Sequence, residues 1–522
     1  MSDHHASSVP KGPPGIILFT PRIACGLLGI LIAAMVAGLN NRVAGLVLVD
    51  MQGALGFASD DASWLNTVYS AGELAAMPFA TWCAITFSMR RFHSLMLSTA
   101  LCLAAIIPFI HNLNLLLTVR ALQGLCSGAL IPILMMAALR FLPPHIRLHG
   151  LALYALTATF SPNVALAIAT WSVDHVEDWR WAYWHVIPLG LMALGLVNYG
   201  IPKMPLVLPR LKQGNWLGMC LGIPGLAFLV IAFDQGVRLD WFHSPIIQSS
   251  LLAGIVFTCL FLITEWRHPT PFMKLQLLQR RNLGLGFSVF FILLIVMSSA
   301  VVLPSNTLMH LHNFRLQQIA AIGLVVGLPQ LVLGSIVALL LYQKWVDARY
   351  LFALGLMCIA LACWMASFIT SDWRIAEFMP AEILQMIGQP LAVVSMLFLG
   401  TSVVQPMEGP YVAGIINTLR AFGTVFGASV VGQFLSQRSK IYHEQLLDQA
   451  ALHTHQSTPF NINLAQLAAD ISQQATILAT ADLYRFFAII AVVLIPIVLC
   501  LQYIPAPQLQ TAPKAPQPND SK

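Results

Sequence analysis

The chain of 522 residues is 58% hydrophobic and only 9% charged, and its mean hydropathy is +0.76. Soluble domains carry roughly 25% charged residues, so this composition excludes a soluble enzyme, whose water-exposed fold could not hide so much apolar surface. The net charge of +6 comes without a basic patch interleaved with aromatic residues, which argues against a nucleic-acid partner.

Fourteen apolar stretches follow one another along the chain, each long enough to cross a bilayer. Spans of about 20 apolar residues indicate helices, whereas membrane barrels show short alternating strands. The sequence therefore predicts an all-α polytopic membrane protein in contact with the lipid bilayer. In chain order, the expected spans are 23–49, 63–87, 94–110, 115–139, 148–173, 181–201, 216–233, 246–264, 283–303, 317–342, 350–369, 378–404, 411–435 and 483–503.

The spans divide into six, an insert of two, and six more. Proline-rich segments at 201–210 and 267–271 separate these blocks. A polar outer segment with an amphipathic stretch precedes the last span, and it favours a surface helix or a partner-docking element. The expected units are a disordered tail (1–21), a six-helix bundle (22–202), a linker with two extra helices (203–266), a second six-helix bundle (267–504) with a periplasmic loop (436–482), and a disordered tail (505–522).

Basic residues indicate the orientation. Most lie in loops on the side shared with the two termini, as Arg90, Arg140, Lys203 and Arg280 do. The positive-inside rule then places both termini in the cytoplasm. No cleavable signal peptide is evident, so a multi-pass protein of the inner (plasma) membrane is expected. The nine cysteines all fall within expected spans and form no CxxC pair, which predicts packing roles.

Three motifs carry a family resemblance. They are Arg-Ala-Leu-Gln-Gly-Leu-Cys-Ser-Gly at 120–128 with Pro132 downstream, Asp-Trp-Arg-Trp-Ala-Tyr-Trp at 178–184, and Asn-Thr-Leu-Arg-Ala-Phe-Gly-Thr-Val-Phe-Gly at 417–427. From about residue 23 to 503 the chain resembles the fourteen-span drug:proton antiporter branch (EmrB/QacA-like) of the major facilitator superfamily. The resemblance implies the major facilitator fold, with two six-helix bundles plus two inserted helices. It also implies multidrug efflux that is driven by a proton gradient and uses no cofactor.

Three departures from the family pattern affect that expectation. The loop motif after the second span retains only its basic end, Arg90-Arg91, and the fifth-span antiporter motif has become Ala-Leu-Ala-Ile-Ala-Thr at 165–170. The first-span acid of the family is replaced by Asn40, followed by the cation Arg42. Because Asn40 cannot carry a proton, another group must do so if protons drive transport.

Glu73 is the candidate for that group. Counted at 1.5 Å per residue from its span end, Glu73 lies roughly 15 Å deep, Arg42 about 12 Å and Arg120 about 9 Å. A charge at such depth in the membrane is energetically unfavourable, so these residues should face one another or a water-filled cavity. The alternative is a static ion pair between Glu73 and either arginine that only holds helices together.

Further polar residues extend the predicted site into the second bundle. Glu382 and Arg420 form a second pair of ionisable candidates, with Glu382 nearer the outer end of its span, where a snorkelling role at the helix end is the alternative. The histidine pairs His310/His312 and His453/His455 lie in outer loops without supporting ligands, so no metal site is expected. Aromatic, methionine and amide side chains suit a pocket for amphipathic compounds, and the substrate-binding candidates are Tyr69, Asn163, Phe290, Met297, Asn306, Gln330, Gln385 and Gln389.

The resulting hypothesis is a secondary carrier that exports small amphipathic, drug-like compounds by proton antiport and alternating access, and not an enzyme. The absence of a GxxxxGK[ST] sequence argues against an ATP-driven pump. A dedicated exporter of an endogenous metabolite, such as an aromatic acid or a siderophore-like compound, is one alternative. A transport-inactive receptor or assembly subunit is another. The resemblance also implies a periplasmic adaptor and an outer-membrane channel as partners, if the host has two membranes.

Overall fold

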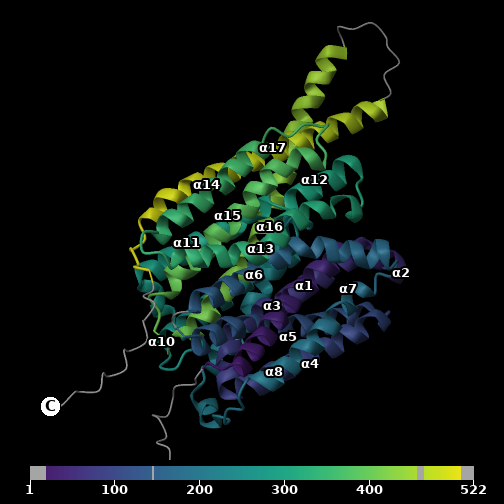
Figure 1. Cartoon of the computed structure of the whole chain (residues 1–522). Helices are drawn as coiled ribbons and strands as arrows, with labels where there is room; N and C mark the ends of the chain where they lie inside the picture. Colours follow the sequence, from purple (N-terminus) through teal and green to yellow (C-terminus); the bar gives the residue numbers. More distant parts are fainter. Residues whose placement is uncertain (1–18, 144–145, 406, 455–463, 507–522) are drawn as a thin grey trace, which may run out of the picture.

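The structure is a computed structural model that describes residues 19–143, 146–405, 407–454 and 464–506. Within these ranges the chain consists of helices and connecting loops and contains no strand. This confirms the all-α prediction. Helices from the first and second halves of the chain form two neighbouring groups, and the end of α17 lies on the side opposite the upper end of α16 (Figure 1).

The first group begins after Thr20, whose side chain caps the first helix by accepting from the Ile23 amide. Asn112 caps α5 in the same way through the Leu115 amide, at 3.1 Å. The elements of this group are α1 (Pro21–Leu46), α2 (Leu48–Leu55), α3 (Ser59–Thr86), α4 (Met89–Ile106), η1 (Ile107–Phe109), α5 (Leu113–Phe141), α6 (Arg147–Thr170), the π-helical turn η2 (Trp171–His175), α7 (Trp181–Trp184) and α8 (Val186–Gly200).

Two helices and three short 3-10 turns connect the groups: η3 (Leu208–Gln213), α9 (Trp216–Gly236), η4 (Trp241–His243), α10 (Pro245–Arg267) and η5 (Leu275–Gln279). The second group then follows. Its elements are α11 (Arg281–Val296), η6 (Met297–Ser299), α12 (Val302–His312), α13 (Leu316–Leu341), α14 (Ala348–Ala366), α15 (Ile375–Thr401), α16 (Gly409–Thr454) and α17 (Leu464–Leu499).

Twelve helical segments of the described chain are long and apolar enough to cross a membrane. The other two expected spans, 63–87 and 181–201, are helical too, but α3 and α8 are not among the twelve. Helix α8 has only 15 residues, and α3 carries Asp60, Asp61 and Glu73. The protein is therefore a multi-pass membrane protein, and the count of fourteen spans stays a prediction.

Glycines of the 120–128 motif bring α5 into backbone contact with α3. A Cβ atom on Gly124 would lie 2.1 Å from the Tyr69 carbonyl oxygen, and one on Gly128 would lie 2.1 Å from the Glu73 carbonyl oxygen. Small residues at helix interfaces allow such close approach in membrane proteins. The motif therefore fixes the position of the α3 backbone at Glu73.

We expect Gly128→Ala to destabilise the protein by about 1–3 kcal/mol, because the added methyl group meets backbone and forces α3 and α5 apart. Gly195→Ala is the matched control, since a Cβ atom at this helical position meets nothing within 4 Å and alanine favours helix by up to about 1 kcal/mol. Thermal unfolding of the detergent-solubilised variants measures the difference. Equal stability of the two variants would contradict this account of the motif.

The two groups meet along two seams. Helix α6 packs against α13, and α16 packs against α3 and α5. The inserted helix α9 lies against both α3 and α16. Its outer end is tied to α3 by the ion pair of Arg238 with Asp60 at 2.8 Å, and Trp241 donates to Gln433 of α16 at 2.7 Å. The insert thus bridges the two halves of the protein.

The other end of the insert is held by a buried carboxylate. Glu265 is fully buried at the end of α10. It accepts from the Asn215 amide side chain at 2.8 Å and from the Met273 main-chain amide at 2.8 Å. These bonds join both inserted helices to the linker that leads into α11. Glu265 is therefore a structural residue at a span end.

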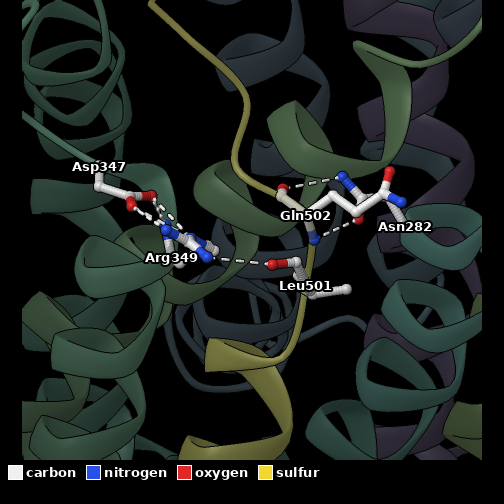
Figure 2. Close-up of polar contacts among 5 residues, drawn as sticks. All are labelled: Asn282, Asp347, Arg349, Leu501 and Gln502. Atoms are coloured by element: carbon white, nitrogen blue, oxygen red, sulfur yellow. Dashed lines mark hydrogen bonds and ion pairs between the residues drawn. The ribbon is translucent and has the colours of Figure 1, made fainter.

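The end of α17 is fastened at the face of the protein where α1 begins and α17 ends, called here the terminal face. Asn282 donates to the Gln502 carbonyl at 3.2 Å and accepts from the Gln502 amide at 2.8 Å (Figure 2). Arg349 donates to the Leu501 carbonyl at 3.2 Å and pairs with Asp347 at 2.7 Å. Carbonyl groups at a helix end need such partners, so α11 and α14 anchor the chain after α17.

A second ion pair at the terminal face joins α11 to the connection between α15 and α16. Arg280 contacts both carboxylate oxygens of Glu408 at 2.7 Å and donates to the Val403 carbonyl at 2.8 Å. The Arg280 guanidinium holds the pKa of the Glu408 carboxyl below its usual range. The pair therefore stabilises the fold while Glu408 is ionised.

A carboxyl with a depressed pKa contributes stability that is present above its unfolded pKa, about 4.3, and that is lost as pH falls through the folded pKa. We expect Glu408→Gln to lower the unfolding temperature at neutral pH and to lose this difference from wild type in acid. Glu444→Gln, at an exposed glutamate of α16, is the control. A pH-independent difference for Glu408→Gln would contradict the prediction.

The polar segment at 436–482 was expected as a loop that contains a surface helix, and the structure shows it helical at both ends, as continuations of α16 and α17. Helix α16 continues to Thr454 and α17 already begins at Leu464, and the two extensions project beyond the rest of the protein (Figure 1). At their base, Asp482 accepts from Tyr442 at 2.6 Å and pairs with Arg438 and Arg485, each at 3.2 Å. Polar composition signals exposure to water, and it does not by itself end a helix.

Candidate transport site

A cavity of about 280 Å³ lies where the two groups of helices meet. Helices α1, α3, α5 and α6 line it from the first group, and α11, η6, α15 and α16 line it from the second. A few convergent polar groups in largely apolar walls are typical of small-molecule sites. Its charged lining residues are Arg42, Glu73 and Arg420, and its polar ones are Asn41, Ser70, Thr157, Asn163, Ser298, Gln389 and Thr424.

A larger cavity of about 710 Å³ lies between the insert and α16. Its lining is almost entirely hydrocarbon and aromatic, with Phe261, Trp266 and Phe422 among its walls. It contains no charged residue and only Thr258, Thr418 and Gln279 as polar ones. The central cavity is therefore the better candidate for a site with chemical selectivity.

Glu73 reaches the central cavity from α3. Three guanidinium groups act on it electrostatically, those of Arg42 on α1, Arg120 on α5 and Arg420 on α16. No hydrogen bond and no ion pair within 4 Å joins the Glu73 carboxyl group to another residue in the part of the chain that the structure describes. The carboxyl thus lies in the combined field of cations from both halves without being fixed to one of them.

Arg120 is fully buried and held by α1, α3 and α5 together. Its guanidinium donates to Gln123 at 2.8 Å and to Asn41 at 3.1 Å. The same group lies 4.5 Å from the ring centre of Tyr69 and 5.4 Å from that of Tyr183. Cation–π contacts and charge-assisted hydrogen bonds of this kind are strong in a dry interior. Arg120 therefore positions Asn41, which lines the cavity.

Arg420 links the two halves on the terminal side of the cavity. It donates to the Thr157 hydroxyl of α6, and its guanidinium lies 5.7 Å from the ring centre of Tyr154. The Tyr154 hydroxyl in turn donates to Asn417 of α16 at 2.8 Å. These contacts join α6 and α16 between the cavity and the terminal face, since both helices begin at that face.

A second polar contact crosses the cavity between the halves. Asn163 of α6 donates to Gln389 of α15 at 3.1 Å and to its own helix at the Thr159 carbonyl, at 2.6 Å. Both amide side chains are buried. Because they come from opposite halves, a substrate that competes for these groups would break this hydrogen bond between the halves.

The structure brings only some of the sequence-predicted residues to the cavity. Among the substrate candidates, Asn163, Met297 and Gln389 line it, and so do the charged candidates Arg42, Glu73 and Arg420. The remaining candidates lie elsewhere: Asn40, Tyr69, Phe290 and Gln385 are buried off the cavity, Gln330 donates to the Met386 carbonyl at 3.1 Å, and Asn306 is exposed on α12.

Two expectations about pairs need correction. Arg420 does not face Glu382, which is buried within the second group on α15 and forms no ion pair with any described residue. His310 and His312 were expected in an outer loop but lie in the last turn of α12, where the His312 ring contacts the Trp373 carbonyl at 2.9 Å. The side chains of His453 and His455 lie outside the described residues.

Sequence reasoning missed several polar residues of the cavity, namely Asn41, Ser70, Thr157, Ser298 and Thr424. Asn41 stands between two predicted site residues, and its side chain donates to Ser70 at 3.0 Å. Its position in the sequence between Asn40 and Arg42 could have identified Asn41 as a site residue. The hydroxyl residues gave none, because serine and threonine are common inside membrane helices.

The fold and this cavity define a class: a helical membrane transporter with a substrate-sized site between two groups of spans. The pattern of the Major Facilitator Superfamily matches residues 30–428, and the chain belongs to this family. The similar proteins include the fatty acid resistance protein FarB of Neisseria gonorrhoeae, which is 23% identical over 90% of this chain and 94% of that one. The probable multidrug resistance protein EmrY of Escherichia coli is 22% identical over 90% and 93%, and the multidrug export protein EmrB of the same organism is 22% identical over 83% and 82%.

Solved structures with the same fold include two transporters. The human organic anion transporter MFSD10 (TETRAN) aligns with a TM-score of 0.55 and 13% identity over 90% of this chain and all of that one. The peptide transporter POT in complex with sulfate aligns with a TM-score of 0.57 and 13% identity over 91% and 94%. At this identity the likeness establishes the major facilitator fold alone.

Proposed function

We propose that the protein is a secondary active exporter of amphipathic organic compounds that works by proton antiport and alternating access. One observation carries the proposal: Glu73 lines the cavity amid guanidinium groups from both halves and is fixed to none of them. Ionised, Glu73 attracts Arg42 and Arg120 of the first half and Arg420 of the second. Protonated, it loses that attraction, so its proton occupancy changes the interaction between the halves.

Rocking of two helix bundles around a midplane site is the usual cycle of such carriers. The contacts that would break and reform are those between halves, Arg420 with Thr157 and Tyr154 with Asn417 on one side of the cavity. The relatives whose names refer to multidrug export and fatty acid resistance support an amphipathic substrate. Localisation in the inner membrane with cytoplasmic termini remains part of this proposal.

The test is flux in proteoliposomes with two probes, ethidium as an amphipathic cation and decanoate as an amphipathic anion. We expect an imposed pH gradient to drive accumulation of at least one probe against its gradient, and a protonophore to abolish it. No movement of either probe in either direction would favour a transport-inactive receptor. Movement that ignores the pH gradient would overturn proton coupling.

Antiport also requires that proton and substrate exclude each other. By linkage, if proton binding lowers the affinity for the probe, then probe binding lowers the affinity for the proton by the same factor. The affinity of the purified protein for the transported probe should therefore fall as pH is lowered. An affinity that rises on acidification would point to co-transport with the proton and overturn the antiport direction.

The outer hairpin, residues 436–454 of α16 and 464–482 of α17, is proposed to dock a periplasmic adaptor that leads to an outer-membrane channel. Its helices project from the side opposite the terminal face (Figure 1). The ion cluster at Asp482 holds the base of the hairpin together. The hairpin thus offers a surface for a partner outside the membrane-spanning part of the protein.

We expect deletion of residues 445–475, closed with a short Gly/Ser linker, to leave membrane insertion and proteoliposome flux intact, because Arg438, Tyr442 and Asp482 remain. Export from whole cells should fall, since an adaptor would lose its docking surface. The comparison is cellular efflux against flux by the purified protein. An equal loss in both would show that the hairpin supports the carrier itself, and no loss in either would contradict adaptor docking.

A further inference from the structure

The second group of helices contains a buried carboxyl that the central cavity does not use. Glu382 on α15 is 2% exposed, and its Oε2 atom has no hydrogen-bond partner among the described residues. Counted from the start of α15 at Ile375, it lies roughly 10 Å from the outer end of the helix. Ionisable side chains at such positions in membrane helices usually serve ions or protons.

The surroundings of Glu382 are polar but carry no cation. Cys363 of α14 and Tyr484 of α17 are the titratable groups that interact with it electrostatically. No arginine, lysine or histidine of the described chain forms an ion pair with it. Of the helices packed against α15, α6, α11 and α14 carry such residues and α13 carries none. The Tyr484 hydroxyl and the side-chain oxygen of Gln385 are also buried and have no hydrogen-bond partner among the described residues. A lone carboxylate here would be strongly disfavoured, which makes the neutral acid the stable form.

Glu382 is connected to the central cavity along one face of α15. Positions 382, 385 and 389 follow at spacings of three and four residues, so they lie on the same side of the helix. All three side chains are buried, and Gln389 lines the cavity. A polar stripe therefore runs from Glu382 through Gln385 to the candidate transport site.

The short 3-10 turn η6, which separates α11 from α12, contacts this polar stripe at Gln385. Gln385 donates to the Ser299 hydroxyl at 2.9 Å, and the Cys363 thiol donates to the same hydroxyl at 3.3 Å. Ser299 belongs to η6, and its neighbour Ser298 lines the cavity. Interrupted helices beside a midplane site are typical places of ion binding in carriers. Movement of η6 during the cycle would alter the surroundings of Gln385 and hence of Glu382.

We propose that Glu382 is a second proton-binding group, joined to the central cavity through Gln385, Gln389 and Ser299, and that its proton is exchanged in the transport cycle. The proton comes from water of the cavity or of the outer face and returns to water, leaving the carboxylate behind. The claim that Glu382 exchanges its proton during the cycle rests on the proposed antiport function. The claim that Glu382 is protonated does not depend on that function.

Infrared difference spectroscopy between H₂O and D₂O tests the protonated acid directly. The measurement uses Glu73→Gln as background, which removes the other cavity carboxyl. We expect Glu73→Gln to show C=O absorption of protonated carboxyl groups at neutral pH, and Glu73→Gln/Glu382→Gln to lose the part of it that Glu382 contributes. Glu73→Gln/Glu377→Gln should retain the band, because Glu377 is exposed on the same helix and ionised. A band that is as strong without Glu382 as with it overturns the proposal.

Proton stoichiometry tests the role in transport. In proteoliposomes with the transported probe, the reversal potential gives the protons exchanged per probe molecule. We expect Glu382→Gln to transport the probe with one proton fewer than wild type, and Glu377→Gln to match wild type. An unchanged ratio in Glu382→Gln overturns the exchange of its proton. If wild type exchanges no proton at all, the antiport function fails, while the infrared result still decides whether Glu382 holds one.

Discussion

Glu73→Gln is expected to abolish transport driven by a pH gradient and to leave the protein folded. The amide keeps the shape of the side chain but cannot gain or lose a proton. Because Glu73 makes no direct hydrogen bond or ion pair with the described residues, the substitution breaks no contact that holds α3 in place. Flux of the probe in proteoliposomes, with and without a pH gradient, measures the effect.

Two further measurements make this expectation decisive. Downhill exchange of the probe between the two sides should persist in Glu73→Gln, because exchange needs the cavity and not the proton. Glu377→Gln, the same chemical change at an exposed position, should behave as wild type in both assays. Undiminished gradient-driven flux in Glu73→Gln would assign coupling to another group and leave Glu73 as a positioning residue for the arginines.

Arg120→Ala is expected to give the largest loss of stability, about 3 kcal/mol or more. It removes charge-assisted hydrogen bonds to Asn41 and Gln123, each worth about 1.5–3 kcal/mol. It also leaves a cavity between the rings of Tyr69 and Tyr183. Transport should fail with it, since Asn41 loses the group that holds it at the cavity.

Arg120→Lys should be less damaging, with a loss of about 1–2 kcal/mol. Lysine keeps the charge but lacks the planar fork that reaches two acceptors and stacks on a ring. Arg91→Ala is the control, because Arg91 is exposed at the start of α4. Thermal unfolding ranks the variants, and probe flux is measured on each. Equal stability of Arg120→Ala and Arg91→Ala would show that the buried contacts of Arg120 contribute nothing to the fold.

The sequence was most informative where one physical effect dominated. In long apolar stretches that cross lipid, a helix satisfies the hydrogen bonds of the backbone within the stretch itself. The predicted spans accordingly lie on helices of the structure. The 120–128 motif was recognised only through the family resemblance, and the structure shows that its glycines allow α5 to approach α3 closely. The charged residues Arg42, Glu73 and Arg420 were identified because ionisable groups at membrane depth are rare.

Amide and aromatic candidates were harder to place. Gln389 and Gln385 lie one helical turn apart on the same face of α15, yet only Gln389 lines the cavity while Gln385 binds Ser299. Tyr69 was expected in a substrate pocket and lies instead beneath the Arg120 guanidinium. Sequence spacing assigns a residue to a face of its helix. It does not say which neighbour covers that face at each depth.

The sequence by itself determined that this protein spans a membrane, that it consists of helices, and which few ionisable residues lie deep within it. The reason is that lipid excludes unpaired backbone and isolated charge wherever they occur along the chain. Only the tertiary structure decided that Arg420 and Glu73, from opposite halves, line the same cavity while Glu382 lies outside it. Side-chain partners on different helices depend on how the helices pack, and that packing comes from contacts between residues distant in the sequence.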